Sequence, residues 1–145
     1  MGWEFAITIT FDGLTNPWDP FADRQRAYRW VTKRSEKALV FASRKLFGPR
    51  WNERGKTPLK AVGFAQKPSA YPHVHIAATA NGKVTRDQLE KALLDAMAKL
   101  CPGANVDVQI YTGPYWIAYC GKEWSLHQYL NRTKGFDDAF FVFAR

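Results

Sequence analysis

Large apolar side chains occupy every second position over residues 3–11, and this spacing predicts the type of the first secondary-structure element. The apolar positions are Trp3, Phe5, Ile7, Ile9 and Phe11. Successive side chains of a strand point to opposite faces of its sheet, so a period of two predicts a strand with one buried face. The strand is expected to end at Asp12-Gly13, where turn residues begin.

A long helix is predicted next. Asp23 can serve as its N-cap, and Gly48-Pro49 ends it. The apolar residues between them recur near helical spacing and are Ala27, Trp30, Val31, Ala38, Leu39, Ala42 and Leu46. The stretch from Trp51 to Pro58 is polar and basic, which predicts a mobile loop.

Two strands and a second helix follow. The strands are expected at about residues 59–66 and 72–79, joined as a hairpin through residues 67–71. Asn81-Gly82 makes the next turn, and Thr85 with Gln88 forms a capping-box pattern that begins the helix. The apolar positions of this helix are Leu89, Ala92, Leu93, Ala96, Met97 and Leu100, and Cys101-Pro102-Gly103 ends it.

The rest of the chain adds a strand and further helical signals. The alternating residues of the strand are Val106, Val108 and Ile110. Gly113-Pro114 places proline near the first turn of a third helix, and Ser125 with Gln128 repeats the capping-box pattern. Residues 140–143 fit either a last edge strand or a packed tail.

The order β-α-β-β-α-β followed by a helix predicts an α+β fold. It is the ferredoxin-like split βαβ arrangement with an antiparallel sheet, and an additional C-terminal helix carries a tyrosine. The chain has 145 residues, of which 46% are hydrophobic, so it can bury one core of useful size. We therefore expect residues 1–145 to form a single domain.

Basic residues dominate the charge. Twenty-one Lys and Arg oppose 13 Asp and Glu, for a formal net charge of +8, and the surplus is concentrated between Arg24 and Lys60. A surface of this kind favours a polyanion, so nucleic acid is the first partner to consider. Solvated helix faces are often basic as well, and charge alone leaves the two interpretations open.

Membrane and secreted classes of protein do not fit the sequence. No stretch approaches the roughly 20 apolar residues that span a bilayer. The N-terminus lacks a charged leader followed by an apolar stretch, and Cys101 and Cys120 form no CxxC motif. We expect an intracellular protein in a reducing compartment.

The sequence Pro-His-Val-His-Ile at residues 72–76 carries the sharpest chemical signal. On a strand, His73 and His75 share a face with their side chains about 7 Å apart, while Val74 and Ile76 enter the core. Two convergent imidazoles can bind a divalent metal ion. Alternate histidines also occur as ordinary surface residues, but two of the three histidines in the chain are here.

A third metal ligand would come from a neighbouring strand. Gln66 stands at the end of the strand that pairs with His73 and His75 through the predicted hairpin. Its amide oxygen could complete a three-ligand face and leave positions for water and a phosphate oxygen. A solvated hairpin glutamine is the other interpretation.

The segment from Tyr115 to Lys122 carries the second chemical signal. On a helix, Tyr119 and Lys122 share a face, so the ammonium could steady a phenolate or a bound phosphate. Tyr115 lies one turn earlier. A tyrosine hydroxyl has an ordinary pKa of about 10, so it needs a cation or an activated electrophile nearby to act as a nucleophile at neutral pH.

In combination, these features resemble the HUH endonuclease superfamily. The resemblance is to its replication-initiator (Rep) branch, which starts rolling-circle or rolling-hairpin replication of plasmids and small single-stranded DNA viruses. It runs from about Phe5 to Leu130. The motifs that carry it are the first-strand motif at residues 7–11, His73-Val74-His75, and Tyr119-Cys120-Gly121-Lys122 as the Tyr-x-x-Lys motif.

The resemblance implies a set of site residues and a reaction. His73, His75 and Gln66 would be ligands of Mg²⁺ or Mn²⁺, Tyr119 the nucleophile and Lys122 its helper. The reaction would be sequence-specific nicking and joining of single-stranded DNA at an origin or stem-loop, through a 5′-phosphotyrosine intermediate, to initiate rolling-circle replication.

The resemblance also bears on partners and location. The sequence contains no helicase segment and no glycine-rich ATP-binding loop, so an initiator of this kind would use a host helicase, or the chain is an excised nuclease domain. The cytoplasm of a bacterial host, or the host nucleus for a virus, is the expected location. Candidate aromatics for base stacking are Trp18, Phe21, Tyr28, Trp51 and Tyr71, and candidate cations are Arg50, Arg54, Lys56 and Lys67.

Other interpretations remain. A transposase or relaxase of the same superfamily would share the two histidines and the nucleophile, although relaxases typically show a third histidine in the motif. A non-catalytic RNA- or DNA-binding module on the same ferredoxin-like frame is the alternative from another class. Tyr115 could be a second nucleophile or a packing residue.

Overall fold

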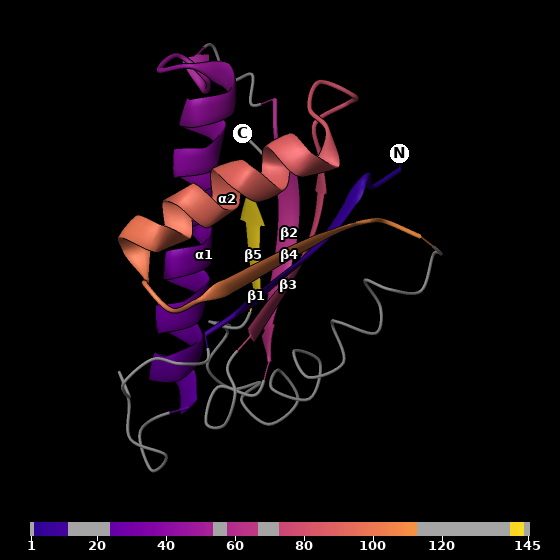
Figure 1. The fold of residues 1–145 in the computed structure, drawn as a ribbon. Coiled ribbons are helices and arrows are strands. Elements are labelled where there is room, and N and C mark those ends of the chain that lie inside the picture. The colour runs from indigo at the N-terminus through magenta and orange to yellow at the C-terminus, as the bar shows by residue number, and fades with distance from the viewer. Residues whose placement is uncertain (1, 12–23, 54–57, 67–72, 113–139, 144–145) are drawn as a thin grey trace.

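The computed structural model describes residues 2–11, 24–53, 58–66, 73–112 and 140–143, with the backbone alone described at 24–28, 66 and 140. Its elements are β1 (Phe5–Thr10), α1 (Arg24–Phe47), β2 (Lys60–Gln66), β3 (His73–Thr79), α2 (Arg86–Leu100), β4 (Asn105–Ile110) and β5 (Phe140–Phe143). Figure 1 shows α2 crossing α1 beside the sheet.

Within the described ranges, five strands form one antiparallel sheet in the order β4-β1-β3-β2-β5. β3 lies between β1 and β2, which α1 connects, and β1 lies between β3 and β4, which α2 connects. Each βαβ unit is therefore split by a strand of the other, which is the predicted ferredoxin-like arrangement. The α+β prediction is confirmed for these elements.

The C-terminal part of the prediction divides into two outcomes. Of the alternatives for residues 140–143, the edge strand is correct, because β5 pairs with β2 through Ala61↔Phe143 and Gly63↔Phe141. The predicted C-terminal helix with its tyrosine lies outside the described residues, as do the proposed N-cap Asp23 and the hairpin segment 67–71.

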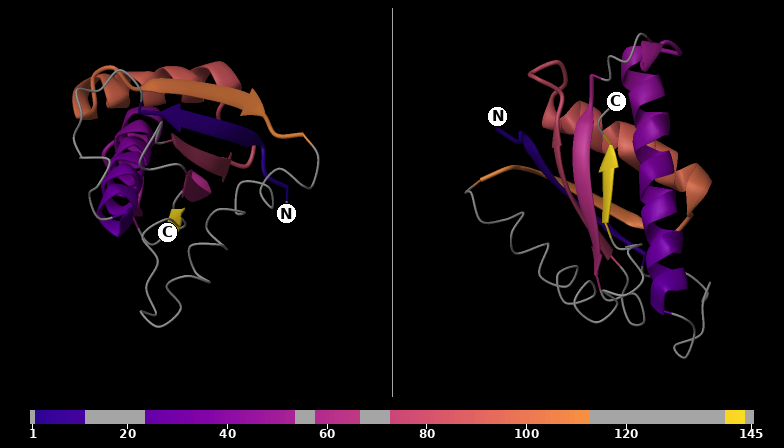
Figure 2. Two further views of the ribbon diagram at one scale, coloured as in Figure 1. Left: turned by 90° about the horizontal axis from the view of Figure 1, so that it is seen from below. Right: turned by 180° about the vertical axis from the view of Figure 1, so that it is seen from behind.

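The two described helices, α1 and α2, lie on one side of the sheet and bury its apolar face (Figure 2). Ile7 and Ile9 of β1 pair with Ile76 and Val74 of β3, and all four side chains are fully buried. The same core cluster includes Leu39 from α1 and Leu93, Ala96 and Met97 from α2. The period of two in the strands and the helical spacing in the helices thus meet in one core.

The turn between β3 and α2 forms at Asn81-Gly82, as the sequence predicts. Asn81 and Gly82 have φ angles of 52° and 76°, and the amide of Lys83 donates to the carbonyl of Ala80. Two successive positive φ angles favour Asn-Gly, since Asn tolerates the left-handed region and glycine has no Cβ. The predicted capping box at Thr85 and Gln88 is present in both directions.

Glu4 ties this turn to the start of β1. Its carboxylate accepts hydrogen bonds from the amides of Ala80 and Gly82 and from the hydroxyl of Thr79. Partial burial acts to raise the pKa of Glu4, but these hydrogen bonds to the charged form outweigh it and hold that pKa below its ordinary value. The turn is therefore fixed by a residue that is far away in the sequence.

The prediction of a mobile loop after α1 is wrong for Trp51, because this residue is packed against the rest of the protein. The indole of Trp51 is 8% exposed and stacks on Phe143 of β5, with ring centroids 5.7 Å apart and planes at 12°. Burial of an aromatic ring of this size outweighs the polar character of its neighbours in the sequence. Trp51 consequently leaves the set of candidate residues for base stacking.

Gly63 on β2 lies directly against the ring of Phe141 on β5, which is itself buried. A Cβ at this position would overlap the ring, so Gly63→Ala should push β5 away from β2. We expect a loss of about 1 to 3 kcal/mol in the free energy of unfolding, as for other overpacked cores. Urea denaturation measures it.

Gly2→Ala is the matched control, because a Cβ at Gly2 meets no atom within 4 Å. Its urea midpoint should equal that of the unchanged protein. An unchanged midpoint for Gly63→Ala would show that β5 does not depend on this close approach.

Candidate metal centre

The central strand β3 presents two imidazoles on the face of the sheet opposite to α1 and α2. Val74 and Ile76 point into the core and are 0% exposed, so His73 and His75 point to the other face. Both histidines are half-buried. Their ring centroids are 4.9 Å apart and their planes cross at 78°. The rings therefore lie closer together than the pleat alone would place them.

This spacing suits two neighbouring ligands of one ion. With a metal–nitrogen bond of about 2.1 Å, each ring centre would lie roughly 3.3 Å from the ion, which puts two ligands at right angles about 4.7 Å apart. The observed separation of His73 and His75, 4.9 Å, agrees with that value. The predicted pair of imidazoles thus fits a divalent metal ion in its spacing and in its chemistry.

The backbone of Gln66 lies where the sequence analysis placed it. Its Cα on β2 is directly opposite that of His73 on β3 in the antiparallel pairing of the two strands. The side chain of Gln66 lies outside what the structure describes. Within the described ranges, no group of three or more His, Cys, Asp or Glu is placed to hold a metal ion.

Thr8 of β1 is a site residue that the sequence analysis did not single out. Its Cα is directly opposite that of His75, and Thr8 Oγ1 lies 3.1 Å from His75 Nδ1, within hydrogen-bonding distance. The period of two already places Thr8 on the face away from the core. Its pairing with His75 depends on the register of β1 against β3, which the predicted ferredoxin-like arrangement does not specify.

His75 is set up as a neutral imidazole. Burial lowers its pKa first, and the charge of neighbouring His73 lowers it further, from 6.5 to about 4. Phe64, the β2 residue directly opposite His75, is itself buried. At neutral pH the ring of His75 is therefore neutral, so one of its two nitrogens is unprotonated and can bind a metal ion without first losing a proton.

The second half of the predicted site lies outside the described residues. This applies to Tyr119 and Lys122 of the Tyr-x-x-Lys motif and to Tyr115. The roles of these side chains stay predictions.

The predicted basic surface is partly resolved, and it lies away from the histidines. The exposed cations of α1 include Lys33, Lys37, Arg44 and Lys45. They belong to the helical layer, on the other side of the sheet from His73. In the part of the chain that the structure describes, the positive charge of α1 is therefore not a lining of the candidate metal centre.

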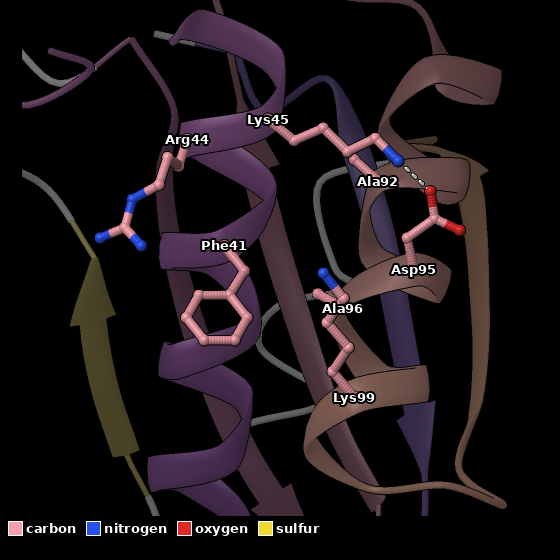
Figure 3. Close-up of a pocket in the computed structure, with 7 residues that line it drawn as sticks. All are labelled: Phe41, Arg44, Lys45, Ala92, Asp95, Ala96 and Lys99. Carbon is pink, nitrogen blue, oxygen red and sulfur yellow. Dashed lines mark hydrogen bonds and ion pairs between the residues drawn. The ribbon is translucent and has the colours of Figure 1, made fainter. Parts of the chain in front are cut away.

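A hollow of about 400 Å³ between α1 and α2 is also separate from the histidines (Figure 3). It is lined by Phe41, Arg44, Lys45, Ala92, Asp95, Ala96 and Lys99. Lys45 reaches across it and forms an ion pair with Asp95. Because the side chains of both partners are exposed, this ion pair contributes little to stability. The sheet lies between the hollow and the candidate metal centre.

Comparisons of the chain with models of known protein families, with curated proteins and with solved structures gave no match.

Among the described helices, none has the length and apolar character to cross a bilayer.

The lowered pKa of His75 predicts a pH dependence of stability in the metal-free protein. The unfolded chain takes up this proton near pH 6.5 and the folded chain near pH 4. The stabilising contribution is therefore complete above about pH 6.5 and is lost as the pH falls toward 4, by about 2 to 3 kcal/mol. Urea unfolding in EDTA at a series of pH values measures it.

His75→Gln is the control for this pH dependence, because it removes the titrating group. The stability difference between the unchanged protein and this variant should shift by that amount between pH 6.5 and 4. Two parallel stability curves would contradict the lowered pKa.

Proposed function

We propose that this chain is a metal-dependent endonuclease that nicks and rejoins single-stranded DNA, of the HUH replication-initiator type. One observation carries the proposal. His73 and His75 lie side by side on the central strand, with ring centroids 4.9 Å apart, on the face of the sheet opposite to α1 and α2. That spacing suits two ligands of one divalent ion, and the sequence offers a Tyr-x-x-Lys motif to act beside it.

In this proposal the metal is Mn²⁺ or Mg²⁺. The ligands would be the imidazoles of His73 and His75 and the amide oxygen of Gln66, whose Cα lies opposite that of His73. Three protein ligands on one side leave room for water and a phosphate oxygen. A bound ion would polarise the scissile phosphate and compensate its negative charge.

Tyr119 is proposed as the nucleophile. Its phenol oxygen forms a new bond to phosphorus while the bond between phosphorus and the 3′-oxygen breaks. The phenol loses its proton and the departing 3′-oxygen gains one, which gives a 5′-phosphotyrosine and a free 3′-hydroxyl. Lys122, on the same helix face as Tyr119 in the predicted helix, would steady the phenolate. One phosphodiester replaces another, so a later 3′-hydroxyl can reverse the step and join strands.

The substrate would be unpaired DNA, because the scissile phosphate has to reach a site on the face of a sheet. The formal net charge of +8 favours a polyanion and makes binding salt-dependent. The exposed cations of α1 that the structure describes lie on the other side of the sheet, so they would attract DNA at long range rather than contact the scissile phosphate. A host helicase would supply the single strand, in a bacterial cytoplasm or in the nucleus of a virus-infected cell.

The test is formation of a covalent adduct. The protein is incubated with MnCl₂ and a 3′-labelled library of single-stranded oligonucleotides that contains origin-like stem-loops. A 5′-phosphotyrosine leaves the labelled 3′ fragment on the protein, so an SDS-stable labelled band is expected. The band should be absent with Tyr119→Phe, with His73→Ala and in EDTA.

Tyr115→Phe is the matched control for the nucleophile, because it removes the same hydroxyl one turn earlier, and it should retain the band. Tight binding without an adduct across the library would contradict the proposal and favour a non-catalytic nucleic-acid-binding module. A band that persists with Tyr119→Phe would assign the nucleophile to another residue.

A further inference from the structure

The bond between Thr8 and His75 joins neighbouring strands at the candidate metal centre. Thr8 Oγ1 and His75 Nδ1 are 3.1 Å apart, and the two residues are directly opposite each other in the pairing of β1 with β3. Thr10 occupies the equivalent place opposite His73. In the described part of the chain, Thr8 bonds to an imidazole nitrogen through its side chain and Thr10 does not.

The position of Thr8 is rigidly held. β1 is paired on both sides, with β3 and with β4, and the neighbours of Thr8 in the sequence, Ile7 and Ile9, are fully buried. Threonine is branched at Cβ, so its χ1 angle is restricted and its hydroxyl has few directions available. The hydroxyl is thus a fixed point against which the ring of His75 can be oriented.

An imidazole that binds a metal ion through one nitrogen carries a proton on the other. Histidine ligands usually donate that second N–H to a nearby acceptor, which sets the ring orientation and the tautomer. A threonine hydroxyl has lone pairs that can accept such a bond. With Nδ1–H donating to Thr8 Oγ1, the lone pair is on Nε2, at the opposite side of the ring.

We propose that Thr8 is the positioning residue for His75: its hydroxyl holds Nδ1 and thereby makes Nε2 the nitrogen that binds the metal ion. This inference rests on the proposed function, since it names the residue that orients one of the proposed ligands. It assigns a role to the first-strand motif, because Thr8 connects that motif to the histidine motif. Thr8 acts on the metal ion through His75 and does not contact it.

The first experiment is isothermal titration of the full chain with MnCl₂. Thr8→Val keeps the branched shape and removes the hydroxyl, and it should weaken Mn²⁺ binding by about tenfold to a hundredfold. Thr8→Ser keeps the hydroxyl and should restore most of the affinity. Thr10→Val is the matched control, since it makes the same change on the same strand and face opposite His73, and it should bind Mn²⁺ as the unchanged protein does.

The second experiment reads the tautomer directly. Nitrogen-15 NMR of the imidazole groups in the Mg²⁺-loaded protein, where the ion is diamagnetic, should show the proton of His75 on Nδ1. In metal-free Thr8→Val, the balance between the two tautomers of His75 should shift relative to the unchanged protein. Circular dichroism and the urea midpoint show that each variant is folded, so a change in the tautomer is not a consequence of unfolding.

The outcomes separate this inference from the proposed function. If the unchanged protein binds no Mn²⁺, the metal site and the role of Thr8 both fail. If the unchanged protein binds Mn²⁺ and Thr8→Val binds it equally well, or the metal is found on Nδ1, the role of Thr8 fails and the metal site stands. Weakened binding by Thr8→Val with rescue by Thr8→Ser supports the inference.

Discussion

The alternation of side chains along β3 is the constraint on which the rest of the structure depends. The strand lies in the centre of the sheet, with Val74 and Ile76 buried against the helical layer. Because the period of a strand is two, burial of these residues forces His73 and His75 to the other face. A shift of one residue in register would bring both imidazoles into the core and expose the apolar pair. Such a shift would bury two polar rings without partners, which is strongly unfavourable. The packing of the core therefore also determines on which face of the sheet the histidines lie.

The strands on either side of β3, β1 and β2, supply the residues that surround its two histidines. β1 brings Thr8 to within 3.1 Å of a ring nitrogen of His75 although the two residues are separated by 67 positions in the sequence. β2 brings the backbone of Gln66 opposite His73 and buries Phe64 beside His75. The same surroundings that hold the imidazole of His75 also keep it uncharged, since burial and His73 lower its pKa to about 4. A neutral, oriented imidazole is the form in which histidine binds metal ions, so the geometry and the electrostatics of His75 both support the proposed metal site.

Among the described residues, the exposed cations of α1 and the proposed metal ligands lie on opposite sides of the sheet. The exposed cations of α1 and the hollow beside Asp95 belong to the helical layer, whereas the histidines belong to the other face. A basic layer at a distance raises the local concentration of a polyanion without selecting where it is cut. In the proposed function, a metal ion held by the histidines would select the position of a phosphate but would contribute little attraction at long range. This division is consistent with a protein that first attracts a nucleic acid and then aligns one phosphate of it.

The strands and helices between residues 5 and 110, and the face on which the histidines lie, could be predicted from the sequence. Periodicity, the capping box at Thr85 and the turn at Asn81-Gly82 are local properties, and the structure confirms each of them. Three features were decided by tertiary structure alone: the pairing of β5 with β2, the burial of Trp51 against Phe143, and the bond from Thr8 to His75. Each joins segments that are far apart in the chain. Local patterns state which face a side chain occupies. Strand order and register, which minimise the exposed apolar area of the whole domain, decide which side chain lies opposite it.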